Sequence, residues 1–160
     1  MKNVFEFSKK FLVLALSAVV ITSCDKDDDD DDMNNNMYTI SGNANGSQMV
    51  PAVTTNGTGT ITGTYNANTN VLTYTTNWSN LSGAPTSGGF FSGASGTAGT
   101  AAGTSWTLGT GLTGTGSFSG TMTLTDAQET QLQGGNWYYS LGTANNTNGE
   151  IRGQITTTAQ

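Results

Sequence analysis

The 160-residue sequence contains no histidine, one cysteine and two prolines. The missing histidine removes the commonest general base and the commonest nitrogen ligand of zinc and copper. A single cysteine cannot close a disulfide within the chain or build a cysteine-rich metal site. We therefore expect no transition-metal site and no cofactor. Nucleic acid is not among the expected partners.

Charged side chains are also scarce after residue 37, where Asp126, Glu129, Glu150 and Arg152 are the only ones. That part of the chain has neither a lysine nor a cysteine, so it offers no amine or thiol nucleophile. Asp126 and Glu129 are one helical turn apart, in positions where acids usually favour the helix dipole. The sequence indicates a non-catalytic protein. The alternative is a carbohydrate-active enzyme, for instance a glycosidase using Glu150.

A signal peptide is predicted over residues 1–23. Three lysines within the first ten residues precede an apolar run at 11–21, which is shorter than the roughly 20 residues that a membrane span needs. The sequence Ile-Thr-Ser-Cys at 21–24 resembles the lipobox of bacterial lipoproteins. The resemblance implies that Cys24 becomes the new N-terminus and is acylated on its sulfur and its amine. Two or more acyl chains suffice for stable membrane anchoring.

An acidic segment follows the cysteine, and residues 24–37 are predicted to form a solvated tether, because a block of like charges cannot collapse. Lys26, Asp27 and Asp28 resemble the export signal that sends some gram-negative lipoproteins to the outer face of the outer membrane. The expected localisation is therefore the outer membrane, lipid-anchored and facing the cell exterior. The alternative is that the acidic run is only a spacer.

Residues 38–160 have a different composition, with 28 Thr and 22 Gly but also Trp and Tyr anchors, and are expected to form one domain. Apolar residues alternate with Thr and Ser at 57–65, 71–78 and 117–124, a pattern typical of half-buried antiparallel strands. Further strands are expected around 38–41, 89–91, 105–108, 137–141 and 150–156. The predicted fold is all-β, an antiparallel two-sheet sandwich.

One short helix is expected between two of these strands, in the segment Thr-Asp-Ala-Gln-Glu-Thr-Gln-Leu-Gln-Gly-Gly. Thr125 is the candidate N-cap, Gln128 three residues later completes a capping box, and Gly134 is the candidate stop.

The two ends of this domain resemble the CHRD domain, a family named after chordin. Asn-Gly-Glu-Ile-Arg-Gly-Gln-Ile at 148–155 is similar to the closing motif of the family, and the segment at 41–53 is similar to its opening. The likeness covers roughly residues 38–157. It implies an immunoglobulin-like β-sandwich, and no general biochemical activity is attached to the family.

The sequence departs from the family pattern where histidines are expected. Gly89 and Phe91 stand in place of a His-x-His element, and Gly142 stands in place of a later histidine. If that cluster binds metal in relatives, this chain cannot do the same.

Glu150 and Arg152 fall in the closing motif, two residues apart on an expected strand. They are predicted to be structural, either as an ion pair or as a clamp that binds neighbouring loops. Trp137, Tyr138 and Tyr139 are consecutive, so at least one ring should point away from the core. They are the candidate ligand contacts, because sugar rings stack on exposed aromatic faces.

The predicted function is that of a lipid-anchored surface module that binds or spaces, with envelope polysaccharide or another surface protein as its partner. Alternating threonines on the outer faces of the strands superficially resemble ice-binding arrays. Such arrays need flat, regular repeats, and the sequence has no strict period.

Overall fold

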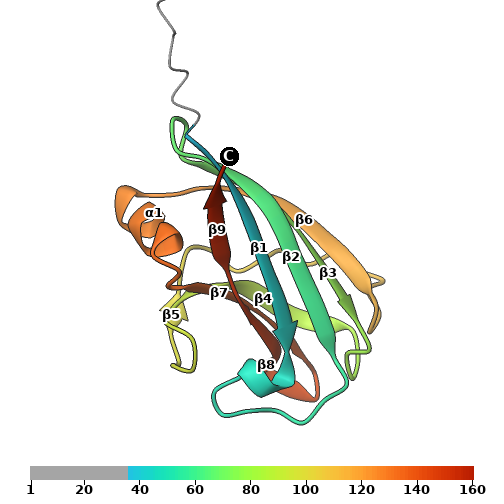
Figure 1. Cartoon of the computed structure of the whole chain (residues 1–160). Coiled ribbons are helices and arrows are strands. Elements are labelled where there is room, and N and C mark those ends of the chain that lie inside the picture. Colours follow the sequence, from blue (N-terminus) through green and yellow to red (C-terminus); the bar gives the residue numbers. More distant parts are fainter. Residues whose placement is uncertain (1–35) are drawn as a thin grey trace, which may run out of the picture. The chain divides into compact units, whose positions relative to one another are not determined.

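The computed structural model describes residues 36–160 (Figure 1). The predicted signal peptide, the acylation site Cys24 and the export signal at Lys26, Asp27 and Asp28 lie outside these residues. Those assignments stay predictions. None of the helices among the described residues is long and apolar enough to cross a membrane.

The described residues form nine strands, one α-helix and one turn of 3-10 helix. The elements are β1 (Met37–Asn45), η1 (Gly46–Gln48), β2 (Thr58–Asn66), β3 (Val71–Ser79), β4 (Pro85–Ser92), β5 (Thr100–Ala101), β6 (Gly116–Thr123), α1 (Asp126–Gln133), β7 (Trp137–Thr143), β8 (Asn146–Gln154) and β9 (Thr156–Ala159). All strand pairs are antiparallel. The predicted all-β class with one short helix is confirmed.

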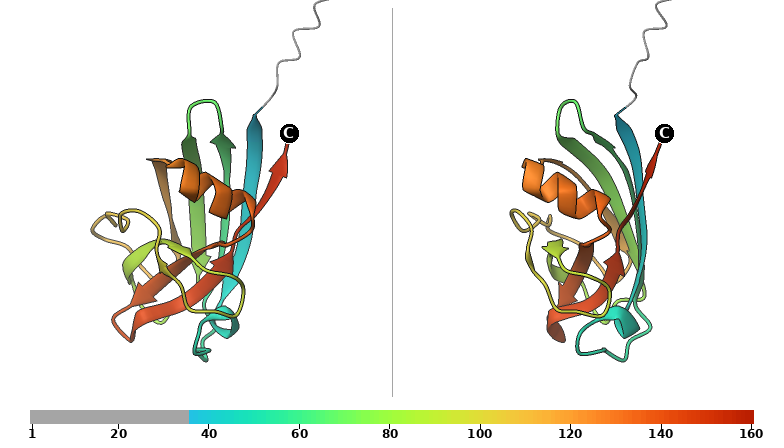
Figure 2. Two further views of the ribbon diagram at one scale, coloured as in Figure 1. Left: turned by 90° about the vertical axis from the view of Figure 1, so that its left-hand side faces the viewer. Right: turned by 60° about the vertical axis from the view of Figure 1, so that its left-hand side comes forward.

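The strands are hydrogen-bonded into one sheet in the order β5-β4-β7-β8-β1-β2-β3-β6, with β9 beside β1. The join between β1 and β8 is a single residue pair, Asn45 with Arg152. At this join the sheet curls, and β7 and β8 cross in front of β1, β2 and β3 (Figure 2). Because the pairing is continuous, the immunoglobulin-like two-sheet detail stays a prediction.

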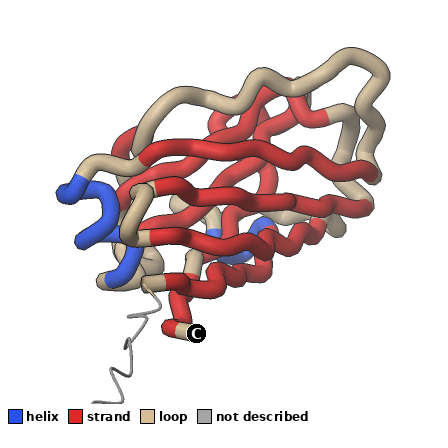
Figure 3. Tube along the Cα trace, turned by 90° about the horizontal axis from the view of Figure 1, so that it is seen from above, coloured by secondary structure: helices blue, strands red, loops and turns tan. Residues whose placement is uncertain are grey.

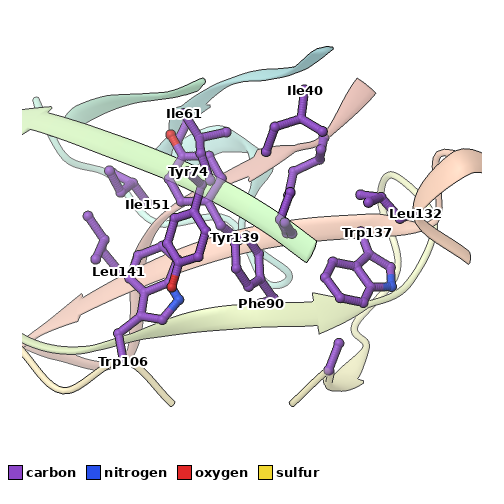
Figure 4. Close-up of a cluster of buried hydrophobic side chains, with 14 of the residues drawn as sticks. Ile40, Ile61, Tyr74, Phe90, Trp106, Leu132, Trp137, Tyr139, Leu141 and Ile151 are labelled. Carbon is purple, nitrogen blue, oxygen red and sulfur yellow. The ribbon is translucent and has the colours of Figure 1, made fainter. Parts of the chain in front are cut away.

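The core fills the space inside the curled sheet. Ile61 and Tyr65 of β2 and Leu72, Tyr74 and Trp78 of β3 all point inward, as their alternation predicts. Phe90, Trp106, Trp137 and Tyr139 complete an aromatic cluster (Figure 4). Full burial of each such side chain stabilises the fold by about 1.5–3 kcal/mol. Residues 36–160 belong to one compact unit that contains this core and the strand pairing, as in domains that fold independently.

The helix agrees with the prediction at both ends. The Thr125 hydroxyl accepts a hydrogen bond from the backbone N–H of Gln128, the Gln128 side chain accepts one from the backbone N–H of Thr125, and Gly134 is the C-cap. Leu132 fixes the helix to the core, because its side chain is fully buried.

The strand predicted at 105–108 is wrong, because these residues form a loop. The backbone N–H of Trp106 donates to the carbonyl of Gly88 at 2.9 Å, and the indole is buried in the core. The loop therefore closes the open side of the curled sheet with one large ring.

The single strand predicted around 150–156 is two strands, β8 and β9. The chain changes partner at Ile155, whose backbone N–H donates to the carbonyl of Trp137 at 2.8 Å. Beyond that residue the chain pairs with β1.

Candidate functional site

Glu150 lies on β8 with a fully buried side chain and holds three segments of the chain together. Its Oε1 accepts from the Thr55 hydroxyl at 2.6 Å and from the backbone N–H of Ser82 at 2.8 Å. Its Oε2 accepts from the hydroxyls of Ser82 and Thr143 at 2.6 and 2.7 Å. Burial raises the pKa of this carboxyl, but the hydrogen bonds together outweigh it and lower the pKa to about 2.

These contacts decide what the Glu150 carboxylate can do. An ionised carboxylate has about four acceptor positions, and four donors occupy them here. With no exposed surface and no free acceptor position, the group is arranged to fix loops rather than to exchange protons with a substrate.

Arg152 lies two residues further along β8 and binds a different loop. Its guanidinium donates to the carbonyls of Thr97 and Ala94 at 2.6 and 2.8 Å and to Gln154 Oε1 at 3.2 Å. Its Cζ atom lies 3.5 Å from the centre of the Tyr138 ring, within the range of a cation–π contact.

This arrangement is that of a clamp onto a loop, one of the two expectations for the pair. Within residues 36–160 the carboxylate of Glu150 and the guanidinium of Arg152 bond separate loops, and no contact joins them. The alternative of an ion pair between Glu150 and Arg152 has no support in these contacts.

Trp137, Tyr138 and Tyr139 do not offer a ring to a ligand. Trp137 and Tyr139 are fully buried in the core, and Tyr138, which faces the other way, is only 7 % exposed. Arg152 covers the Tyr138 ring, and a backbone N–H of the loop at 93–99 donates to its hydroxyl at 3.1 Å. Tyr138 points away from the core cluster, as expected, but the loop at 93–99 folds over the outer face of β7 and covers its ring. The assignment of these residues as ligand contacts stays a prediction.

The positions where the family pattern expects histidines also lie on β4 and β7. Gly89 and Gly142 are buried and Phe91 is half-buried. Across residues 36–160, no three or more His, Cys, Asp or Glu side chains come together. The exposed surface of these residues has one large hydrophobic side chain, Val50, which is 39 % exposed. No aromatic ring of the described residues is fully exposed.

A chemically uniform surface forms on the outer face of β9, β1, β2, β3 and β6, here called the hydroxyl face. Its three middle rows of cross-strand partners contain only Thr, Ser and Asn. Across the strands the rows are Thr158–Thr39–Thr64–Thr73–Thr121, Thr156–Ser41–Thr62–Thr75–Ser119, and Asn43–Thr60–Asn77–Ser117.

The hydroxyl face is an open array of hydrogen-bonding groups. Of these fourteen residues, all but Thr64 and Thr75 are exposed. Neighbours in a row are about 4.7–4.9 Å apart between strands, and those along a strand about 6.6–6.8 Å apart. Two hydroxyl pairs within the rows bond each other, Ser41 with Thr156 at 3.1 Å and Thr75 with Ser119 at 2.8 Å. The strands of this half run side by side (Figure 3).

The sequence predicted part of this face. The alternation of apolar and polar residues places the threonines of β2 on an outer face, at Thr58, Thr60, Thr62 and Thr64. It also places the threonines and serines of β3 and β6 on an outer face. The alignment of these residues into rows depends on strand register, for which a single sequence of this kind carries no signal.

A comparison with protein-family models matches residues 40–155 to the CHRD domain. No curated protein and no solved structure matches the chain significantly.

Proposed function

The chain belongs to the CHRD domain family, and we propose that it is a non-catalytic, lipid-anchored binding module of the cell envelope. Its proposed binding surface is the hydroxyl face, and its proposed ligand is an uncharged polysaccharide.

The observation that carries this proposal is the chemistry of the hydroxyl face, where fourteen neighbouring side chains can hydrogen-bond and none is charged or aromatic. Such a surface matches a ligand that is itself neutral and rich in hydroxyl groups. Each hydrogen bond between the domain and a ligand in water would contribute only about 0.5–1.5 kcal/mol to the free energy of binding. A polymer can engage many of them at once, so weak contacts add up to useful avidity.

The charges of the domain favour a neutral polymer over an anionic one. Arg152 is the only cation after residue 26, and its side chain is 2 % exposed. Across residues 36–160 the surface thus presents no accessible positive side chain to phosphate, sulfate or carboxylate groups.

The burial and hydrogen bonding of Glu150 support a non-catalytic role and argue against the alternative of a glycosidase that uses this residue. That carboxylate is buried and fully bonded, whereas a glycosidase needs two carboxyl groups open to the sugar. Burial raises the pKa of Tyr74 to about 12, so this phenol is a poor proton acceptor near neutral pH.

The proposed anchor is Cys24, because no other cysteine is available for acylation. Cys24→Ala should release the protein from the membrane fraction or leave an unprocessed precursor, and metabolic labelling with a fatty-acid analogue tests this. Label that persists in the variant would refute the anchor.

The proposed export signal at Lys26, Asp27 and Asp28 is tested separately. Replacing residues 26–32 by a neutral Gly/Ser run should preserve lipidation and lower display at the cell surface, measured by protease treatment of intact cells. Unchanged display would leave the acidic run as a spacer.

The ligand is tested with residues 36–160 as soluble protein, passed over immobilised neutral and anionic polysaccharides from the envelope. Retention by a neutral polymer that is the same at low and high salt supports the proposal, because uncharged hydrogen bonds are not screened. Retention that occurs only on anionic polymers and disappears with salt contradicts it.

Ice is a second candidate ligand, favoured specifically by the one row that consists of five threonines in register, which the sequence did not reveal. A fluorescently labelled domain that adsorbs to growing ice crystals and slows their growth would support it. Exclusion of the domain from the ice would rule it out.

A further inference from the structure

The hydroxyl face is hollowed at one end of β1, β2 and β3. On these strands its third row is followed by one more row of polar residues, two positions further along each strand. Between the two rows lies a hollow of about 430 Å³, a size typical of sites that hold small molecules. The two rows are Asn43–Thr60–Asn77 and Asn45–Thr58–Ser79.

The hollow has polar walls and a buried floor. All six side chains of the two rows line it, and none of them is charged. Ala44, Gly59 and Trp78 lie between the rows and also line the hollow, but all three are buried. A ligand in the hollow therefore meets backbone below it and amide and hydroxyl groups around it.

Asparagine amides distinguish this end from the rest of the hydroxyl face. The fourteen residues of the face include two asparagines, Asn43 and Asn77, and both lie at the hollow together with Asn45. An amide presents a donor and an acceptor side by side, whereas a hydroxyl presents a single oxygen. Two adjacent hydroxyl groups on a sugar ring complement an amide, because one can donate to it while the other accepts from it.

One row of the hollow is free to bind. Asn43, Thr60 and Asn77 are exposed, and within residues 36–160 no hydrogen bond involves their side chains. Asn43 and Asn77 lie on opposite sides of the hollow, and their Cα atoms are about 9.4–9.8 Å apart because one strand separates them. A ligand between them can bind both amides.

The other row is fixed by hydrogen bonds. Asn45 Oδ1 accepts from the Ser47 hydroxyl at 2.7 Å and from the backbone N–H of Gln48 at 3.2 Å, so its amide nitrogen remains as a donor. The hydroxyls of Thr58 and Ser79 bond each other at 3.0 Å. Side chains that are held in place before binding lose less conformational entropy when a ligand arrives.

We propose that this hollow is a subsite for one hexose ring, whose vicinal hydroxyl groups are bound by the amides of Asn43 and Asn77. This inference rests on the proposed function, and it adds the part of the face that recognises the sugar. The remaining rows of hydroxyls bind the polysaccharide chain next to that ring.

The lining favours a sugar over a peptide or a phosphate ester. The six side chains of the walls include no apolar side chain on which an apolar residue of a peptide could be buried, and no cation that could bind a phosphate. A neutral ring rich in hydroxyl groups matches both properties.

NMR titration of residues 36–160 tests the subsite directly, with methyl α-glucopyranoside, methyl α-mannopyranoside and methyl α-galactopyranoside as probes. The side-chain amide signals of Asn43, Asn45 and Asn77 are the readout. At least one glycoside should shift these signals along a saturating curve. Pentaerythritol, a neutral polyol without vicinal hydroxyl groups, should not shift them.

Removing the two free amides gives a second measurement. Asn43→Ala with Asn77→Ala should keep the melting behaviour of the parent, because both side chains are exposed and unbonded within the described residues. Its affinity for the glycoside and for the neutral polysaccharide should fall by about tenfold or more. The matched control, Asn56→Ala with Asn148→Ala, removes two exposed amides outside the hydroxyl face and should bind like the parent.

Three results would overturn the subsite. The amide signals of the hollow could stay unchanged with every glycoside, or shift equally with pentaerythritol, or the Asn43→Ala, Asn77→Ala variant could bind the polysaccharide like the parent. In the last case the polysaccharide still binds, so the proposed function stands without this subsite. Failure of every neutral polysaccharide to bind the parent would refute the proposed function and the subsite with it.

Discussion

Glu150 and Arg152 are two residues apart on β8, and each charge is stabilised by uncharged groups. Hydroxyls and one backbone N–H surround the carboxylate, whereas backbone carbonyls and a tyrosine ring surround the guanidinium. A buried charge is costly unless hydrogen bonds replace its water, and both groups meet that condition. Both residues therefore act on loops.

Acid should weaken the Glu150 contacts. The pKa of this carboxyl is about 2 in the folded state against an ordinary value of 4.5, so the unfolded state binds the proton more readily between these values. Its contribution to the free energy of unfolding, on the order of 3 kcal/mol, is complete above about pH 4.5 and is lost as the pH falls toward 2. Urea unfolding at a series of pH values measures this loss.

The same titration on Glu150→Gln isolates the effect. The variant should be less stable than the parent at pH 7 and should lose much less stability on acidification. Glu129→Gln, which removes a carboxylate from α1 without touching the Glu150 contacts, should keep the acid sensitivity of the parent. Equal acid sensitivity in the parent and in Glu150→Gln would contradict the assignment.

Removing the Arg152 side chain should destabilise the domain. Arg152→Ala removes the donor to the carbonyl of Thr97 and one of the three donors to the carbonyl of Ala94, and should cost on the order of 1–3 kcal/mol. Arg152→Lys should also lower the melting temperature, because an ammonium group cannot reproduce the planar fork that reaches both carbonyls and stacks on Tyr138.

Thermal melting and limited proteolysis of the loop at 93–99 measure this effect. Cleavage of the loop should speed up in both variants. If both variants melt like the parent and lose binding to an envelope component, Arg152 is a ligand contact and the clamp assignment fails.

Among the elements, the sequence predicted best those that depend on local chemistry. The helix was predicted from Thr125, Gln128 and Gly134, all of which act within α1 and its caps. Period-two alternation likewise identified β2, β3 and β6, because each has one buried face.

The errors occur where a distant contact decides the structure. Residues 105–108 alternate like a strand, but Trp106 fills the core from a loop whose one backbone hydrogen bond to a strand goes to Gly88 of β4. At Ile155 the chain still bonds Trp137 of β7, but the next residue, Thr156, pairs with Ser41 of β1, so one expected strand becomes two. Neither partner can be identified from local residue types.

The capping box gives a prediction at the scale of the helix. Thr125→Ala removes the side-chain acceptor for the Gln128 N–H and should destabilise the domain by about 1 kcal/mol. Thr130→Ala makes the same chemical change inside the helix and should alter stability by less than about 0.5 kcal/mol. Urea unfolding of the two variants compares them, and equal losses would show that the cap contributes nothing.

On the scale of the whole molecule, the register of the paired strands aligns polar side chains into a surface that no single strand contains. The residues of the hydroxyl face come from five strands, with β4 and β5 between β3 and β6 in the sequence and α1, β7 and β8 between β6 and β9. Each strand alone shows only alternating polar residues. Of the aromatic residues predicted to contact ligand, Trp137 and Tyr139 are buried in the core, and Tyr138 is covered by a distant loop. The sequence therefore predicted the fold class, whereas the rows of the hydroxyl face became visible only with the strand register.

The most direct test of the proposed function is the affinity of residues 36–160 for a neutral envelope polysaccharide. Thr62→Lys with Thr64→Lys places two long charged side chains in the middle of the hydroxyl face, whereas Thr86→Lys with Thr147→Lys places them on exposed positions outside it. The account predicts that the first variant loses binding by about tenfold or more, equivalent to about 1.4 kcal/mol, and that the second binds like the parent. Equal binding by all three proteins would contradict it.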